Sequence, residues 1–227
     1  MSNGKHRTMA TIKRVPSFIP QIYEYRAWQA EQTVCGIDEV GRGCLSGPVV
    51  AAAVILPPYT DHPLIKDSKT LTPKQRQKAY EWITTHAQYA VGITHHRIID
   101  TLNIYHATLV AMKRAATQLL TTSSYKPQYI LTDAMPLILS GCHDIVYFTH
   151  GEHQSSSIAA ASIVAKVTRD RLMKRLDTVF PCYGLSHHFG YSTPLHKKEL
   201  ALRGATLLHR HSFTITSSEK NEQTELF

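Results

Sequence analysis

The 227-residue sequence predicts an α/β fold in which helices flank a mixed β-sheet. Two observations lead to this prediction. Apolar, β-branched segments come first, and segments with strand and helix patterns then alternate along the chain. The length also suits one domain with a substantial core, and no repeat or linker divides the chain.

Strand patterns recur five times along the chain. The first has the sequence TVCGIDEV, and the second, PVVAAAVIL, is apolar throughout and is therefore expected to be buried on both faces. The other three segments combine β-branched and aromatic residues. The predicted strands are residues 33–40, 48–56, 88–96, 128–133 and 144–150.

Helix patterns fill the remaining segments of the folded region. The predicted helices are residues 72–87, 103–120, 155–179 and 193–205. Thr72 and Pro73 are a preferred N-cap and first-turn pair, Asn103 and Ser155 are plausible caps, and Gly204 is a helix terminator.

Composition divides the chain into three parts. Residues 1–30 are largely polar and basic and are expected to be poorly ordered, residues 31–213 form the folded domain, and residues 214–227 read as a flexible polar tail. The charge balance is 25 Lys and Arg against 17 Asp and Glu, which suits a polyanionic partner.

The cysteines and the apolar runs indicate where the protein works. The cysteines (Cys35, Cys44, Cys142 and Cys182) lack the spacing of a zinc site, which favours free thiols in a reducing compartment. The longest apolar run, Val49 to Leu56, falls far short of the roughly 20 residues that span a bilayer. We therefore expect a cytoplasmic protein.

Four acids stand where a solvated surface does not explain them. Asp38 and Glu39 end the first strand, Asp133 ends the fourth, and Asp170 lies on a helix rich in Ala and Ser that is suited to close packing on a sheet. Gathered together, these carboxylates would repel one another. A hard divalent cation relieves that repulsion, and oxygen ligands favour Mg²⁺ or Mn²⁺ over zinc.

Two of these acids also have simpler interpretations. Asp133 would fit as the cap of a turn, and Asp170 would fit as a surface charge paired with Lys166 or Lys174 one helical turn away. Adjacent carboxylates between two buried segments are harder to explain without a cation. The pattern by itself predicts a metal-dependent enzyme and nothing narrower.

Seven motifs occur in the order and spacing of a known family. They are GIDEVGRGCLSGPVVAAAVIL, KDSKTL, LNIYHATLVAM, YILTDA, SIAAASIVAKVTRD, YGLSHHFGY and GATLLHRHSF, and together they extend from about residue 34 to residue 213. With them the sequence resembles ribonuclease HII. The resemblance implies an RNase H-like fold with a five-stranded mixed sheet and a small C-terminal helical subdomain, at about residues 181–213.

The resemblance also implies an activity and a metal site. Enzymes of this family cut the RNA strand of RNA/DNA hybrids and nick duplex DNA 5′ of embedded ribonucleotides, leaving 3′-hydroxyl and 5′-phosphate ends. This activity serves ribonucleotide excision and RNA primer removal. By motif position, the ligands of two Mg²⁺ or Mn²⁺ ions are Asp38, Glu39, Asp133 and Asp170.

Recognition of the substrate is implied for a second set of residues. By motif position, Gly41, Arg42, Gly43 and Tyr191 read the junction between DNA and RNA, and Ser68 and Lys69 contact phosphate. Without the surrounding matches, the Gly-Arg-Gly segment would read as an ordinary tight turn and the tyrosine as a core aromatic.

The sequence departs from the family pattern near several of these motifs. His150 and Glu152 stand where Lys-Gly-Asp is common, and Phe189 and His211 each replace a basic residue. Fewer permanent positive charges predict weaker substrate binding at neutral pH and a shallower slope in a salt titration of hybrid affinity.

The alternatives to ribonuclease HII are a binding protein without activity and a related enzyme. A non-catalytic hybrid-binding protein would be favoured if one of the four acids were replaced. Ribonuclease HIII carries an additional N-terminal domain, and about 30 residues before the first strand are too few for one. We expect a monomer that acts on nucleic acid.

The last five residues form a separate motif. Gln223, Leu226 and Phe227 resemble the Gln-x-x-Leu-Phe peptides that dock in the hydrophobic groove of the bacterial sliding clamp. The alternative is an acidic tail without function, since so short a pattern arises easily by chance.

Overall fold

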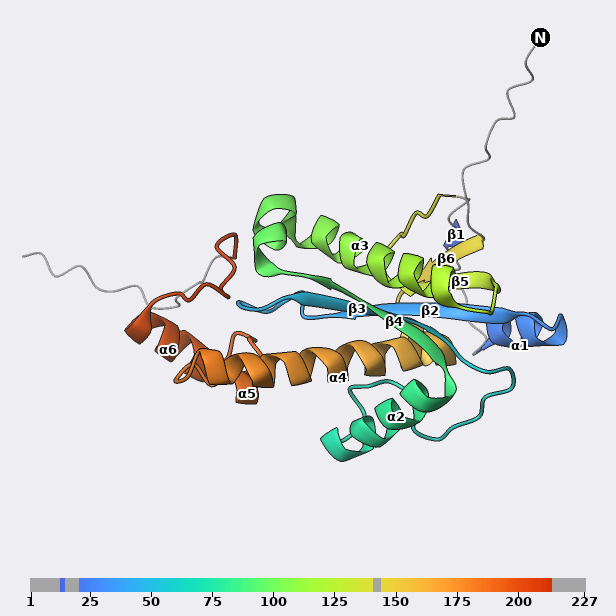
Figure 1. The fold of residues 1–227 in the computed structure, drawn as a ribbon, viewed down its shortest axis with the longest axis horizontal. Helices are drawn as coiled ribbons and strands as arrows, with labels where there is room; N and C mark the ends of the chain where they lie inside the picture. The colour runs from blue at the N-terminus through green and yellow to red at the C-terminus, as the bar shows by residue number, and fades with distance from the viewer. Residues whose placement is uncertain (1–12, 15–20, 141–143, 214–227) are drawn as a thin grey trace, which may run out of the picture.

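The computed structural model describes residues 13–14, 21–140 and 144–213 (Figure 1). Its strands are β1 (Lys13–Arg14), β2 (Thr33–Val40), β3 (Val49–Ile55), β4 (Gln88–Thr94), β5 (Pro127–Asp133) and β6 (Asp144–Phe148). The sheet order is β1-β6-β5-β2-β3-β4. The five predicted strands are confirmed, and the two-residue β1 adds a sixth at the edge beside β6.

Both parallel and antiparallel pairs occur in this sheet. Strand β2 pairs antiparallel with β3 and parallel with β5, which in turn pairs parallel with β6. The carboxyl ends of β2, β5 and β6 therefore meet at one edge of the sheet, where a site can collect side chains from all three strands.

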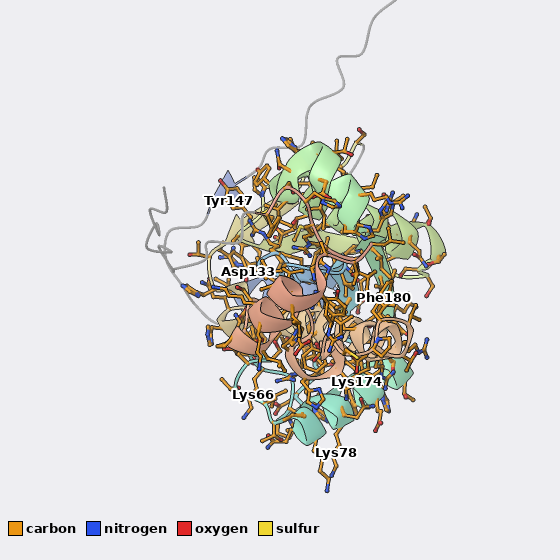
Figure 2. All side chains as sticks on the ribbon, turned by 90° about the vertical axis from the view of Figure 1, so that its left-hand side faces the viewer. Lys66, Lys78, Asp133, Tyr147, Lys174 and Phe180 are labelled. Atoms are coloured by element: carbon orange, nitrogen blue, oxygen red, sulfur yellow. The ribbon has the colours of Figure 1, made fainter. Side chains whose placement is uncertain are left out.

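Helices cover both faces of the sheet. They are α1 (Ile22–Gln29), α2 (Pro73–His86), α3 (His96–Thr122), α4 (Ser156–Val179), α5 (Leu185–His188) and α6 (Pro194–Arg203), with a short 3₁₀ helix η1 (Gly151–His153) before α4. Helix α3 lies on one face, whereas α4 and α2 lie on the other (Figure 1). The side view in Figure 2 shows the same layers, with the exposed Lys78 pointing outward from α2.

Two glycines let the helices approach the strands closely. A Cβ on Gly36 of β2 would lie 2.1 Å from the main-chain carbon of Ser157 in α4. A Cβ on Gly92 of β4 would lie 2.0 Å from the carbonyl oxygen of Ala111 in α3. Small residues in α4 also allow this helix to pack closely on the sheet, as their abundance in the sequence predicted.

The helix ends follow the predicted capping residues. Thr72 and Gln75 form a reciprocal capping box at the start of α2, and Ser155 caps α4. Helix α3 differs, because it begins at His96 and kinks at Asn103. The Asn103 side chain accepts a hydrogen bond from the main-chain N–H of His106 at 3.1 Å, so it caps the segment after the kink.

The expectation of poor order throughout residues 1–30 is wrong for α1. Ala27 and Trp28 of this helix are buried, and Glu24 is fully buried and accepts hydrogen bonds from the Ser155 hydroxyl and the Ser157 N–H. The helix has only eight residues, and its weak apolar pattern does not stand out among polar neighbours. Tertiary packing against the start of α4 and the sheet stabilises it.

The C-terminal helical part packs on α4 and on the turn after β2. Met173 of α4 shares a small core with Tyr183, Leu185 and Leu200. Isolated β-bridges join Cys44 to Tyr191 and Ser46 to His209. Among the described residues, no helix is long and apolar enough to cross a membrane.

Candidate active site

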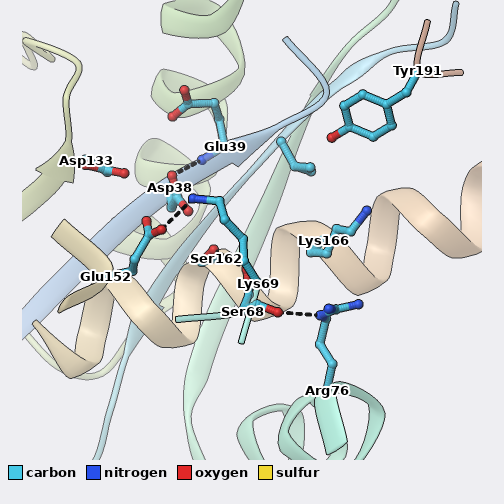
Figure 3. A pocket seen from close by; sticks show the side chains of 11 residues that line it. Asp38, Glu39, Ser68, Lys69, Arg76, Asp133, Glu152, Ser162, Lys166 and Tyr191 are labelled. Carbon is cyan, nitrogen blue, oxygen red and sulfur yellow. Dashed lines mark hydrogen bonds and ion pairs between the residues drawn. The ribbon is translucent and has the colours of Figure 1, made fainter. Parts of the chain in front are cut away.

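Three carboxylates meet at the edge where the parallel strands end. Asp38 follows Ile37, which pairs with Thr132, so Asp38 and Asp133 are neighbours on β2 and β5. Helix η1 follows β6 and brings Glu152 to the same place. One carboxylate oxygen from each of Asp38, Asp133 and Glu152 lies within 4.8 Å of the other two, and Figure 3 shows the three side chains converging.

The structure corrects the predicted set of acids at Asp170. This residue lies on α4, where its carboxylate accepts a hydrogen bond from the Lys166 ammonium at 2.8 Å. It does not line the cavity that contains the other acids. Glu152, whose position in the sequence marked only a departure from the family pattern, stands with Asp38 and Asp133 instead.

A cavity of about 270 Å³ opens beside these carboxylates. It contains three of the four predicted acids, the predicted phosphate-contacting pair and the predicted tyrosine. The lining residues are Asp38, Glu39, Val40, Ser68, Lys69, Arg76, Asp133, Glu152, Ser162, Lys166 and Tyr191. Sequence positions as distant as 38 and 191 thus share one cavity, across which Tyr191 faces the acids in Figure 3.

Burial and mutual repulsion make Asp38, Glu39 and Asp133 hard to ionise. Burial raises the pKa of Asp38 well above its ordinary value, and the charges of Glu39 and Asp133 raise it further. Burial also raises the pKa of Glu39 to about 7, although the Arg42 guanidinium opposes the shift. The pKa of Asp133 is raised by burial and by Glu152, against a 2.9 Å hydrogen bond from the Gly151 N–H.

The donor set fits a hard divalent cation. Every ligand atom is a carboxylate oxygen, as Mg²⁺ and Mn²⁺ prefer. Glu39 Oε2 is buried without a hydrogen-bond partner among the described residues, while Oε1 accepts from Arg42 at 3.2 Å. The Lys69 ammonium donates to Glu152 at 2.6 Å, so a cation already occupies one side of the group. Asp38, Glu39, Asp133 and Glu152 would hold the metal.

We expect the stabilisation of the folded protein by a bound metal to depend on pH. Asp38, Glu39 and Asp133 have raised pKa values and bind a proton more tightly when folded than when unfolded, so without metal their stabilising contribution is present at low pH and lost as pH rises. For Glu39 this loss extends from 4.5 to about 7. A bound cation favours the charged carboxylates. The increase in melting temperature caused by Mg²⁺ should therefore be small below this range and largest above it.

Melting curves in Mg²⁺ and in chelator, recorded across that pH range, measure the increase directly. Taking the difference cancels the titration of groups remote from the site. Asp38→Asn should reduce the increase at every pH. An increase that is the same at low and high pH would contradict the role given to these acids.

Of the predicted substrate-binding residues, Ser68, Lys69 and Tyr191 line the cavity, whereas the Gly-Arg-Gly segment lies outside its lining. Gly41, Arg42 and Gly43 form the turn directly after β2, and Arg42 makes an ion pair with Glu39. Ser68 Oγ lies 2.9 Å from Ser162 Oγ on α4. The predicted clamp-binding residues Gln223, Leu226 and Phe227 lie outside the described residues.

Helix α2 positions the loop that carries Ser68 and Lys69. The Arg76 guanidinium donates to the carbonyl oxygens of Ser68 at 2.9 Å and Leu71 at 2.8 Å. Arg76 also lines the cavity, as does Lys166. The site therefore opposes a buried acidic group with cationic side chains, an arrangement suited to a phosphodiester and its metal.

A comparison with protein families decides what kind of site this is. The ribonuclease HII family model matches residues 35–216. The chain belongs to the ribonuclease HII family. Ribonuclease HII of Levilactobacillus brevis is 46% identical over 193 residues, which are 85% of this chain and 73% of that relative.

Solved structures agree with this assignment. The ribonuclease H2 of Pyrococcus horikoshii is 25% identical, with a TM-score of 0.64 over 80% of this chain and 94% of that one. The RNase HII in a complex with PCNA from Archaeoglobus fulgidus is 24% identical, and its TM-score of 0.66 over 83% of this chain and 98% of that one shows a shared fold. The RNase H-like fold is thus confirmed. As a member of this family, the protein is an endonuclease that degrades RNA in RNA/DNA hybrids.

Proposed function

We propose that this member of the ribonuclease HII family is a metal-dependent enzyme that also nicks duplex DNA 5′ of embedded ribonucleotides and leaves 3′-hydroxyl and 5′-phosphate ends. The observation that carries the proposal is the single cavity shared by the carboxylate group and Tyr191. The acids supply a metal site, and the tyrosine supplies a partly exposed aromatic surface beside it.

Each part of the site has a distinct role in this reaction. Asp38, Glu39, Asp133 and Glu152 hold the divalent cations. When bound, Mg²⁺ or Mn²⁺ activates a water molecule and stabilises the charge that develops on the leaving oxygen. Lys69 and the other cations of the cavity attract the phosphodiester backbone.

Recognition of the ribonucleotide falls to the turn after β2 and to Tyr191. The N–H groups of Arg42 and Gly43 donate no hydrogen bond within the described part of the chain, and Gly43 is exposed. Glycine allows a ribose or phosphate to approach the main chain closely. The 2′-hydroxyl is the group that distinguishes RNA from DNA, and we assign its detection to this turn.

Nicking of a DNA duplex that carries one ribonucleotide tests the proposal. The expected result is a single cut 5′ of the ribonucleotide, seen with Mg²⁺ or Mn²⁺ and lost with chelator. Enzymatic end-labelling of the products reports the 5′-phosphate. A matched duplex with 2′-methoxy in place of the hydroxyl should remain intact. Cleavage that persists in chelator would contradict metal dependence, and cleavage elsewhere would contradict the assigned recognition.

We further assign the protein to ribonucleotide excision and primer removal in the cytoplasm, where it acts as a monomer on chromosomal nucleic acid. The C-terminal motif with Gln223, Leu226 and Phe227 supports docking to the sliding clamp, because two apolar residues at the end of a polar segment suit a hydrophobic groove.

Deleting residues 223–227 should abolish capture of the enzyme by immobilised clamp and leave hybrid cleavage unchanged. The double variant Gln223→Ala and Phe227→Ala should have the same effect as the deletion. Thr224→Ala, between these two positions, is the matched control. Unchanged capture after the deletion would remove the docking assignment.

A further inference from the structure

Two buried arginines lie behind the turn that follows β2. Arg169 of α4 is fully buried, and Arg210 of the C-terminal part is 3% exposed. Neither forms an ion pair with a carboxylate of the described residues. A buried charge without a counter-ion is costly unless hydrogen bonds replace the lost water. Their partners therefore show what the two side chains are for.

Arg210 binds three carbonyl groups of the turn region. Its Nη2 donates to the carbonyl oxygen of Gly41 at 2.6 Å and to that of Gly47 at 2.9 Å. Its Nη1 donates to the carbonyl oxygen of Arg42 at 2.7 Å, and its Nε donates to that of Gly47 at 3.1 Å. All the hydrogen bonds of the guanidinium thus go to the two ends of residues 41–47.

Arg169 joins this turn to the segment that carries Tyr191. Its Nε and Nη2 donate to the carbonyl oxygens of Pro48 at 2.9 Å and Ser46 at 3.2 Å. Its Nη1 donates to the carbonyl oxygen of Phe189 at 2.8 Å. Gly41 has a φ of +93°, and a Cβ there would lie 2.2 Å from Arg169 Nε, so the guanidinium fills the space that the glycine leaves.

These contacts fix the direction in which the turn presents its main chain. The carbonyl oxygens of Gly41 and Arg42 point inward to Arg210, and the N–H groups of Arg42 and Gly43 remain without an acceptor in the described part of the chain. Two positive charges directly behind the turn also make this surface more attractive to a phosphate. Burial lowers the pKa of Arg210 to about 10, so it stays charged at neutral pH.

We propose that Arg210, with Arg169, is a positioning residue for substrate recognition: it orients the Gly41–Gly43 turn so that free N–H groups face the nucleic acid. The inference rests on the proposed role of this turn and adds the groups that shape it. Lysine carries the same charge but lacks the planar fork that reaches several carbonyls at once, so Arg210→Lys separates geometry from charge.

The test compares wild type, Arg210→Lys, Arg169→Lys and the control Arg203→Lys. Arg203 is an exposed arginine of α6 that pairs with Glu199.

Three measurements are made on each variant. Steady-state cleavage of the single-ribonucleotide duplex gives KM and kcat, hybrid affinity is measured separately in chelator, and a melting curve reports folding. For Arg210→Lys we expect KM and the hybrid dissociation constant to rise about tenfold or more, as for lost charge-assisted hydrogen bonds. We expect kcat to change little.

The alternatives give different results. A purely structural role predicts a lower melting temperature with KM and hybrid affinity unchanged, and that result would overturn the proposal. Loss of folding in both lysine variants would overturn it as well. If wild type fails to nick the ribonucleotide duplex, the proposed nicking activity fails, and hybrid affinity in chelator still decides whether Arg210 positions the turn.

Discussion

Asp38→Asn is expected to lower the rate of RNA cleavage in an RNA/DNA hybrid by more than about 100-fold. Residues that only orient the ligands of a metal typically lower metal affinity or activity by about 10–100-fold when they are changed. Loss of a ligand itself should therefore lower activity more. Asp38 is 5% exposed and lies between Glu39 and Asp133, whose charges already raise its pKa. The amide keeps the size of the side chain and removes the charge that a cation needs. Single-turnover cleavage with excess enzyme measures the effect.

A pair of matched variants tests which acid completes the metal site. Glu152→Gln should lower cleavage by more than about tenfold and weaken Mn²⁺ binding measured by titration calorimetry. Asp170→Asn should leave both within about threefold, because it loses only a partly exposed ion pair with Lys166. A large loss in Asp170→Asn with little change in Glu152→Gln would show that Asp170 binds the metal, and it would contradict the placement of Glu152 beside Asp38 and Asp133.

The misplacement of Asp170 has a simple geometric cause. Ser162, Lys166 and Asp170 follow one another at helical spacing on α4, and the first two line the cavity. A residue eight positions beyond Ser162 lies about 12 Å farther along the helix axis. The spacing in the sequence places Asp170 on the same face of α4 as Ser162 and Lys166. The distance along α4, however, carries Asp170 past the carboxylates of the cavity.

The position of Glu152 in the sequence indicates a place in the site once the strand order is known. Because β2, β5 and β6 are parallel, an acid just after the third of these strands reaches the edge where Asp38 and Asp133 lie. The pairing of β5 with β6 had to be known before this rule applied, and His150, in the left-handed conformation before η1, sets the turn that delivers Glu152. The strands follow local pattern, but such turns, like the short helix α1, depend on tertiary packing.

The start of α4 packs directly on β2, and Gly36→Ala should disrupt this contact. We expect this variant to lose about 3 kcal/mol or more of unfolding free energy. The new Cβ would lie 2.1 Å from the main-chain carbon of Ser157 and 2.3 Å from the N atom of Ile158. Both atoms belong to main chain held by the Ser155 cap and by Glu24, so no flexible side chain can move aside.

Gly43→Ala is the matched control, since a Cβ there meets no atom within 4 Å. It should alter the unfolding free energy by less than about 0.5 kcal/mol. Urea unfolding of both variants, in chelator so that metal binding does not contribute, gives the comparison. If Gly36→Ala unfolds at the wild-type midpoint, α4 can move away from β2 without cost. If it is destabilised as expected, the distance between α4 and β2 is fixed by one glycine, and with it the positions of Ser162 and Lys166 relative to Asp38.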